Sequence, residues 1–276
     1  PPDNTTLLAE YRFDECSSAS NLLDTQGSYD AMAHGIPQPD PNGIIGQALD
    51  LSANSVTDWV TLPPGSIDGL GDFTTSVWIR TTVSKDQQEI YQALGSSHSD
   101  DELESHLVGS NIVNLTVQNR GINFNSSKSL TDGEWHQIVL MRTDREGCLY
   151  VDGQFEECKP RVNSTPLSVT NTAGFVLGQE QDRYGSRFDI RQGFEGQLDE
   201  LRFYSGNLSS ANVSRIYANE KAGLNHDGTT RSAISCERAP VAEYRFDETS
   251  WSGGAGEVVD SIGGFSGSAT ATQPID

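Results

Sequence analysis

The sequence predicts an all-β protein, an antiparallel two-sheet sandwich with one short helix. Short apolar runs recur along the chain, and turns rich in glycine and asparagine separate them, with 27 glycines in total. Regularly spaced short strands of this kind are typical of sandwiches. With 276 residues, the chain is long enough for one large all-β domain or two small ones, and either can bury a core.

Strands are expected where apolar residues occupy alternate positions, most clearly over 73–79 and 135–140. Further strands are expected over 47–51, 59–62, 112–117, 174–177 and 197–203. One helix is expected over 209–218, because a serine cap precedes apolar residues that fall on one helical face. We expect this helix to pack over a sheet edge.

The phrase AEYRFDE occurs twice, at 9–15 and at 242–248, and a related turn follows each copy. We therefore interpret the repeated unit as a whole domain. The predicted organisation is one domain over 1–237 and the N-terminal fragment of a second tandem copy over 238–276, which is too short for a sandwich. We expect the fragment to be partly disordered or to add its strand to a sheet edge.

The four cysteines are compatible with buried thiols, a metal site or two disulfides. Cys148 and Cys158 flank an Asp-Gly turn between apolar strands, so their sulfurs should lie close together across a hairpin. A bond between Cys16 and Cys236 would tie the ends of the domain together. We predict two disulfides and hence an extracellular or cell-surface location. The alternative is that one pair is reduced and merely packed.

The chain carries 39 acidic and 18 basic residues, a formal charge of -21. Such a surface repels nucleic acids and anionic membranes and attracts cations, so no nucleic-acid partner is expected. The longest apolar run, 138–141, is far too short to cross a bilayer, and no membrane insertion is expected. No leader precedes Pro1, and we expect the chain to derive from a longer precursor.

Motifs of catalysis are not visible in the sequence. Sandwich glycoside hydrolases need two carboxylates on one strand, and no segment shows that spacing on a plausible strand. The nearest acidic run, 100–104, is interpreted as a solvated loop or as a rim contributor to cation binding. The five histidines lack zinc-ligand spacing, and no nucleophile elbow or phosphate-binding loop occurs. We therefore expect no enzymatic activity.

The order of these pieces resembles the laminin-G-like, or concanavalin A-like, jelly roll over roughly the first 237 residues. The phrases that carry the likeness lie at 46–49, 73–78, 133–136, 149–153 and 196–200. The resemblance implies a jelly-roll topology for the predicted sandwich. The repeat and the cysteine placement also resemble the tandem domains of bacterial MSHA-pilus MshQ-like surface adhesins.

The stretch 177–196 is similar to the calcium loop of the pentraxins. In that family this loop and a second one hold two calcium ions, and the exposed ion coordinates phosphate-bearing or sugar ligands. Carried over by position, the implied calcium ligands are Glu180, the backbone carbonyl of Gln181, Asp182, Asp189 and Gln192. The residue types agree, because calcium prefers carboxylate, amide and carbonyl oxygens. The alternative is a solvated acidic turn.

The second pentraxin loop has an imperfect counterpart here. When the loops are aligned on Glu89-Ile90, the Asp-Asn pair of the family falls on Gln87 and Gln88. Only a one-residue slip in this alignment puts Asp86 at the position of the family's aspartate. The resemblance therefore implies at least one calcium, with Asp86 as a further ligand, rather than a pair of ions. A weaker resemblance implies a structural calcium between Asp24 and Asp199. The alternative is that Asp199 is a plain strand residue.

These features predict a calcium-dependent, lectin-like domain that binds a carbohydrate or a phosphate-bearing ligand within a multidomain extracellular adhesin. The alternative is a structural spacer in a tandem-repeat surface protein, in which calcium only stabilises loops. A sandwich hydrolase is a third class, without support from the motifs. Loop shape sets specificity in this fold, so the sequence does not identify the ligand.

Overall fold

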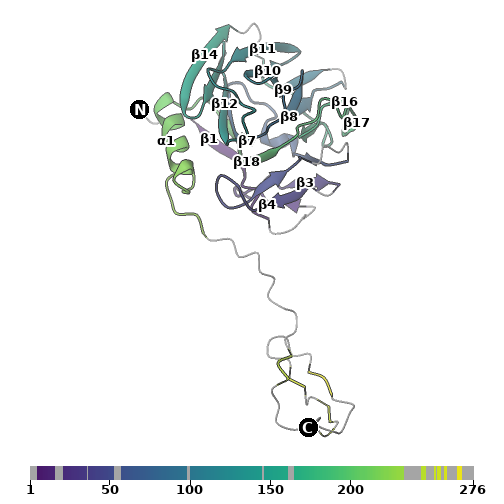
Figure 1. Ribbon diagram of the computed structural model, residues 1–276. Coiled ribbons are helices and arrows are strands. Elements are labelled where there is room, and N and C mark those ends of the chain that lie inside the picture. Colours follow the sequence, from purple (N-terminus) through teal and green to yellow (C-terminus); the bar gives the residue numbers. More distant parts are fainter. Residues whose placement is uncertain are drawn as a thin grey trace. The chain divides into compact units, whose positions relative to one another are not determined.

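Figure 1 shows the computed structural model of the chain. The described residues are 5–15, 21–35, 37–52, 57–97, 100–144, 146–160, 165–232, 244–246, 252, 254–255, 258–259 and 266–268. The chain divides into two compact units, Pro1–Ile234 and Ser235–Asp276. All the named helices and strands belong to the first unit.

The first unit contains two large antiparallel sheets. One is made of β1 (Thr6–Tyr11), β4 (Gln38–Asp40), β5 (Ala48–Asp50), β7 (Phe73–Arg80), β12 (His136–Arg142), β13 (Glu146–Val151), β14 (Gln154–Pro160) and β18 (Gln197–Ser205). The other is made of β2 (Asn21–Leu22), β3 (Ala31–His34), β6 (Trp59–Thr61), β8 (Gln88–Leu94), β9 (Asp101–Val108), β10 (Ile112–Val117), β11 (Arg120–Asn125) and β15 (Phe175–Leu177).

The strand orders are those of a jelly roll, with neighbours in space that are distant in sequence. The first sheet runs β14-β13-β12-β7-β18-β5-β4, and β1 pairs with β18. The second runs β11-β10-β9-β8-β15-β6-β3-β2. A separate hairpin of β16 (Gln181–Arg183) and β17 (Ser186–Phe188), the 3-10 helix η1 (Pro64–Ser66) and the helix α1 (Ser210–Lys221) complete the domain. The predicted antiparallel sandwich is confirmed.

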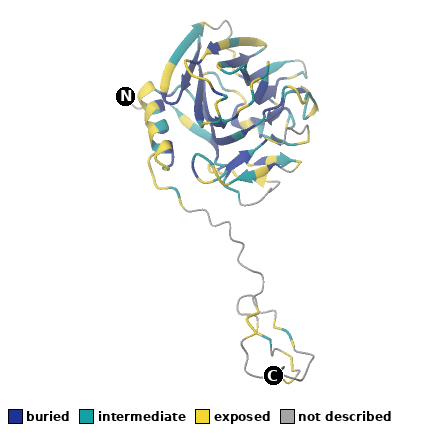
Figure 2. Ribbon diagram, in the orientation of Figure 1, coloured by how far each residue is buried: buried dark blue, intermediate teal, exposed yellow. Residues whose placement is uncertain are grey.

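The main core lies between the two sheets and draws buried residues from both. Figure 2 shows most of the strands of these sheets coloured as buried. At its centre the ring of Tyr91 packs edge-on against Phe175 and Phe203, at centroid distances of 6.4 and 5.9 Å. Burying one large apolar side chain contributes roughly 1.5–3 kcal/mol. The single core spans both sheets and holds the loops at their edges in fixed positions.

Strands β7 and β12 are buried on both faces, although their sequences alternate as if one face were exposed. Helix α1 accounts for this difference. Its Val213 and Ile216 pack with Val139, Tyr150 and their neighbours in a second apolar cluster. These partners belong to different strands of the first sheet, so the helix covers the face of the sheet. The helix also contacts β14, the edge strand of this sheet, so the expected packing over a sheet edge holds in part.

The hairpin of β13 and β14 carries the predicted disulfide. Cys148 and Cys158 are directly opposite each other in the strand register and are bonded. The turn is formed by Asp152 and Gly153, both with positive φ, as a two-residue hairpin turn requires. The disulfide between Cys148 and Cys158 is therefore confirmed. Cys16 and Cys236 lie outside the described residues.

The first AEYRFDE copy is built into the domain. Tyr11 and Phe13 are 0% and 2% exposed, whereas their counterparts in the second copy, Tyr244 and Phe246, are 38% and 61% exposed. Among the described residues of the second unit, Val258 and Gly267 form an antiparallel bridge. The assignment of 238–276 to a second tandem domain stays a prediction.

Among the described residues, no helix is long and apolar enough to cross a membrane.

Candidate metal centre

The segment that resembles a calcium loop forms the hairpin β16–β17, which is anchored on β8. The backbone N–H of Gln181 donates to the side-chain oxygen of Gln92 at 2.7 Å, and its side-chain amide donates to the carbonyls of Gln92 and Gly174. Gly185 forms the turn at φ +58°, a conformation that favours glycine. The side chain of Gln181 is occupied by these bonds, which agrees with a ligand role for its backbone carbonyl only.

Glu180 lies immediately before this hairpin and is partly buried. Burial raises the pKa of its carboxyl group to about 7, and the negative charges of neighbouring carboxylates add to the shift. These neighbours are Asp182, Glu104, Asp101 and Asp189. Across the described parts of the chain, no hydrogen-bond donor or basic side chain pairs with the side chain of Glu180 or Asp182. Glu180 and Asp182 therefore lack a compensating cation, whereas Asp189 pairs with Arg191 and Glu104 with His106.

The remaining predicted ligands line one surface hollow. Asp86, Gln87, Asp189 and Gln192 surround a volume of about 350 Å³, together with Lys85 and Arg191, and we call this the metal-side hollow. The side-chain amide of Gln192 donates to Gln87 Oε1 at 2.9 Å, and the carbonyl of Gln192 accepts from the N–H of Glu89 at 2.7 Å. These bonds hold the two loops together. The structure thus brings Asp86 beside Asp189 and Gln192.

Asp189 already has a partner in Arg191. Their closest contact is 2.5 Å, and hydrogen bonds from the side chain and backbone of Arg191 lower the pKa of Asp189 to about 2. The Arg191 side chain is 83% exposed. Exposed ion pairs contribute roughly 0–1 kcal/mol to stability, so a divalent cation can replace Arg191 as the partner of Asp189 at little cost.

The donor set fits calcium. Calcium takes six to eight oxygen ligands at 2.3–2.6 Å in a flexible geometry. The predicted residues supply four carboxylates, one amide and one backbone carbonyl, and no nitrogen or sulfur ligand is required. The negative charge of Asp189 contributes to the raised pKa of Glu180. The metal-side hollow, which Asp189 lines, is therefore linked electrostatically to Glu180 and Asp182.

Asp101 and Glu104, whose charges act on Glu180, belong to the run 100–104, for which a contribution to the rim of a cation site was the alternative interpretation. The run 100–104 was predicted to be a solvated loop, and this is wrong because its residues from Asp101 onward form β9. Leu103 and Leu107 of this strand are buried in the core. Their spacing was the signal for a strand, and the surrounding charges obscured it.

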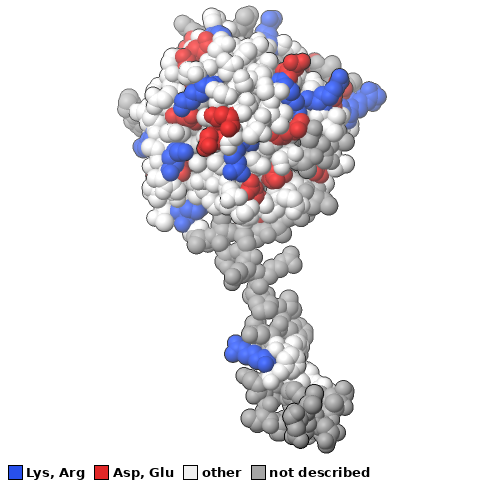
Figure 3. All heavy atoms as spheres, viewed as in Figure 1, with Lys and Arg blue, Asp and Glu red and all other residues white. Residues whose placement is uncertain are grey.

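The acidic side chains are not gathered into one patch on the visible face of the domain. Figure 3 shows Asp and Glu interspersed with Lys and Arg on this face. The net charge of -21 therefore does not by itself locate a cation site.

The second suggested calcium, between Asp24 and Asp199, is not supported by the environment of either carboxylate. Asp24 accepts hydrogen bonds from four backbone N–H groups, of Glu10, Gln26, Ser28 and Tyr29. Asp199 is fully buried and accepts from the N–H groups of Ile44, Ile45 and Glu200. Both carboxylates fix backbone turns, and these roles account for their positions.

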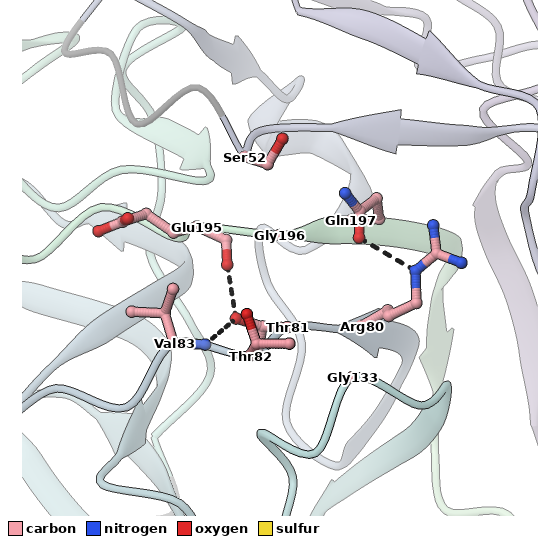
Figure 4. Close-up of a pocket in the computed structure, with 9 residues that line it drawn as sticks. All are labelled: Ser52, Arg80, Thr81, Thr82, Val83, Gly133, Glu195, Gly196 and Gln197. Carbon is pink, nitrogen blue, oxygen red and sulfur yellow. Dashed lines mark hydrogen bonds between the residues drawn. The ribbon is translucent and has the colours of Figure 1, made fainter.

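A second hollow of about 350 Å³ lies on the other side of the ion pair between Lys85 and Glu195, whose atoms are 2.6 Å apart. Lys85 lines the metal-side hollow and Glu195 lines the second hollow. Figure 4 shows Arg80 donating to Gln197 along one wall, at 3.1 Å. The guanidinium of Arg80 also lies 4.9 Å from the ring centroid of Trp135. Polar groups and an aromatic ring therefore flank the surface next to the metal-side hollow.

Residues 54–214 match the family model described as the concanavalin A-like lectin/glucanases superfamily, Laminin_G_3. The chain belongs to this family. C-reactive protein 1.4 of Limulus polyphemus is 23% identical over 181 residues, which cover 60% of this chain and 74% of that protein. Jeltraxin of Lepidobatrachus laevis is 24% identical over 166 residues, 59% of this chain and 72% of that protein. Neuronal pentraxin-2 of Cavia porcellus is 33% identical over 88 residues, 32% of this chain but only 21% of that protein.

Solved structures show the same fold. Domain 4 of AbnA, a GH43 extracellular arabinanase from Geobacillus stearothermophilus in complex with arabinotriose, superposes with a TM-score of 0.57 at 18% identity over 77% of this chain and 98% of that one. The binding domain of botulinum neurotoxin serotype G gives a TM-score of 0.57 at 13% identity over 77% of this chain and 51% of that one. The laminin-G/pentraxin-like resemblance is confirmed. An origin in a pilus-associated adhesin stays a prediction.

Proposed function

We propose that this laminin-G-like domain is a calcium-dependent recognition module that binds a carbohydrate or another oxyanion-bearing ligand. The environment of Glu180 supports this most strongly. Its carboxylate is partly buried among other carboxylates and has no basic partner among the described side chains. A charge that is left uncompensated in this way is costly unless a cation binds there.

The proposed calcium ligands are Glu180 and Asp182 from the hairpin, with the carbonyl of Gln181 between them. Asp189 and Gln192 would close the site from the following segment, and Asp86 from the facing loop. When bound, the ion supplies positive charge and open coordination positions for oxygens of a ligand. Replacement of the Arg191 contact would free the carboxylate of Asp189 for the ion.

The second hollow supports a carbohydrate as ligand. Sugar sites combine a few placed polar groups with an aromatic surface. Arg80 and Gln197 line the second hollow, and Trp135, which is not part of its lining, contacts the guanidinium of Arg80. The carbohydrate-bound state of the similar arabinanase domain agrees with this class of ligand. The disulfide between Cys148 and Cys158 supports an extracellular location.

Isothermal titration with calcium tests the metal centre. We expect binding by the unmodified chain and its loss in Glu180→Gln, which keeps the shape and removes the charge. Glu134→Gln is the matched control, because Glu134 is an exposed glutamate outside the centre. Absence of binding heat at millimolar calcium, together with a melting temperature that chelator does not change, would overturn the proposal.

A structural spacer is the second candidate, and the repeat at 9–15 and 242–248 favours it. A glycan array probed with and without calcium separates the two functions. A recognition module gives hits that require calcium and that disappear in Glu180→Gln. A spacer gives no calcium-dependent hits, even if calcium raises its melting temperature.

A further inference from the structure

Three metal-ligating side chains converge on strands β8 and β9. Glu89 lies on β8, and Glu104 and His106 lie on β9, with Glu89 directly opposite His106 in the strand register. One ligand atom from each residue lies within 4.8 Å of the other two. The Nδ1 atom of His106 is 2.6 Å from Glu104 Oε1 and 3.5 Å from Glu89 Oε2.

Glu89 provides an independent indication that this cluster holds a ligand. Its side chain is fully buried, and its Oε1 atom has no hydrogen-bond partner among the residues that the structure describes. A buried carboxylate oxygen without a partner costs free energy, of the order of 1–3 kcal/mol. The other carboxylate oxygen faces His106 and the amide of Gln87.

The charges of the cluster suit a divalent cation. Two ionised carboxylates and one neutral imidazole carry two negative charges, and one divalent cation balances them.

We propose that Glu89, Glu104 and His106 form a second metal site, which takes a transition-metal dication such as Zn²⁺. Zinc is bound by imidazole nitrogen and carboxylate oxygen at about 2.0–2.2 Å, so tetrahedral ligands lie about 3.4 Å apart. The separation of 3.5 Å between His106 and Glu89 already meets this. The 2.6 Å contact between His106 and Glu104 is a hydrogen bond that must open by rotation of the glutamate side chain.

Gln87 is placed to serve as the fourth ligand. Its Nε2 atom faces both carboxylates, at 3.2 Å from Glu89 and 3.3 Å from Glu104. Rotation of the amide would present its oxygen to the ion and would break the bond that this oxygen accepts from Gln192. The histidine distinguishes this site from the calcium centre, because calcium prefers oxygen ligands and zinc accepts imidazole. The inference goes beyond the proposed function and does not depend on calcium binding.

Zinc titration of metal-free protein in saturating calcium tests the inference. We expect one zinc per chain, and His106→Asn should weaken its affinity by at least about tenfold. The double variant Glu180→Gln, Asp182→Asn should bind zinc as the unmodified chain does. His34→Asn is the matched control, because His34 is a partly exposed histidine on β3.

An unchanged zinc affinity in His106→Asn would overturn the proposal, as would loss of zinc binding in the double variant. Because His106→Asn can impair folding, anomalous scattering at the zinc edge from crystals of the unmodified chain provides a second test. The expected peak lies about 2.0–2.2 Å from His106 Nδ1. Zinc peaks only at other histidines would contradict the site.

Discussion

The domain contains two clusters of acidic side chains that differ in their counter-charges. In the arginine-centred cluster, Arg202 is fully buried and pairs with Glu10, Glu200 and Glu220. In the calcium-centre cluster, Glu180 lies among Asp182, Asp189, Asp101 and Glu104, and no basic side chain within the described residues pairs with Glu180. The first cluster has three carboxylates and the second has five, so both are acidic and their counter-charges separate them.

The basic partner decides the role of each cluster. In the first, burial opposes ionisation of Glu10, but a hydrogen bond from His226 and the charge of Arg202 hold its pKa well below the ordinary value. The second oxygen of Glu220 accepts from Trp78 and Gln137, at 2.6 and 2.9 Å. These carboxylates are satisfied within the protein and stabilise the fold. Glu180 lacks such partners, and on this ground we propose that its cluster binds a cation.

The largest effect is expected when the basic partner of the first cluster is removed. Arg202→Met keeps much of the volume but removes the cation that three buried glutamates share, although Glu10 keeps its contact with Arg12 and Glu200 its contact with Arg231. Removal of one partner from a buried ion cluster costs roughly 3–5 kcal/mol. Urea unfolding measures this loss, and a change below about 1 kcal/mol would show that the arginine does not hold the cluster together.

Calcium should supply the missing partner of the second cluster. At a free concentration of one hundred times its dissociation constant, calcium adds about 2.7 kcal/mol to the free energy of unfolding. Glu180→Gln should abolish this gain, whereas Glu220→Gln should lower stability with or without calcium. Differential scanning calorimetry in calcium and in chelator measures both. Equal calcium responses in the two variants would remove the distinction between the clusters.

The pH dependence of stability without calcium gives a smaller effect. Burial first, and nearby carboxylates second, raise the pKa of Glu180 from its ordinary 4.5 to about 7. The folded chain therefore binds more protons here than the unfolded chain between these pH values, and its stability falls as pH rises through that window. With allowance for solvent screening, we expect a loss on the order of 1 kcal/mol. Denaturant unfolding in chelator should show this loss of stability with rising pH, and Glu180→Gln should remove it. A pH profile that is unchanged in Glu180→Gln would argue against the raised pKa of Glu180.

The smallest effect concerns the exposed pair of Arg191 and Asp189. Arg191→Ala should change the free energy of unfolding by less than about 0.5 kcal/mol. Because the arginine competes with calcium for Asp189, the variant should bind calcium about two- to fivefold more tightly. Calcium titration of the variant beside the unmodified chain measures this. Weaker binding by the variant would mean that Arg191 supports the centre rather than competes for it.

The strands and the disulfide could be predicted because their signals are local. Alternating apolar residues mark β7, and an Asp-Gly turn between strands aligns Cys148 with Cys158. The contribution of β9 was missed, since charged residues flank Leu103 and conceal its alternation. The approach of His106 to Glu89 depends on the register of β8 with β9, which no local pattern determines.

The pentraxin likeness identified the candidate ligands, but their grouping needed the three-dimensional structure. Asp86 was expected only through a slip in the alignment, and it lines the same hollow as Asp189 and Gln192. The pairing of Asp189 with Arg191 was not visible in the sequence order alone, although the two residues are close neighbours. Side-chain direction and burial decide such contacts, and both depend on the folded chain.

A crystal structure of the chain grown in calcium tests the central claim most directly. The account predicts an ion within about 2.3–2.6 Å of carboxylate oxygens of Glu180 and Asp182, with six to eight oxygen ligands in total. Asp189 should have turned from Arg191 toward the ion. Density for water alone at Glu180 and Asp182 in millimolar calcium, with the contact between Asp189 and Arg191 intact, would contradict the account.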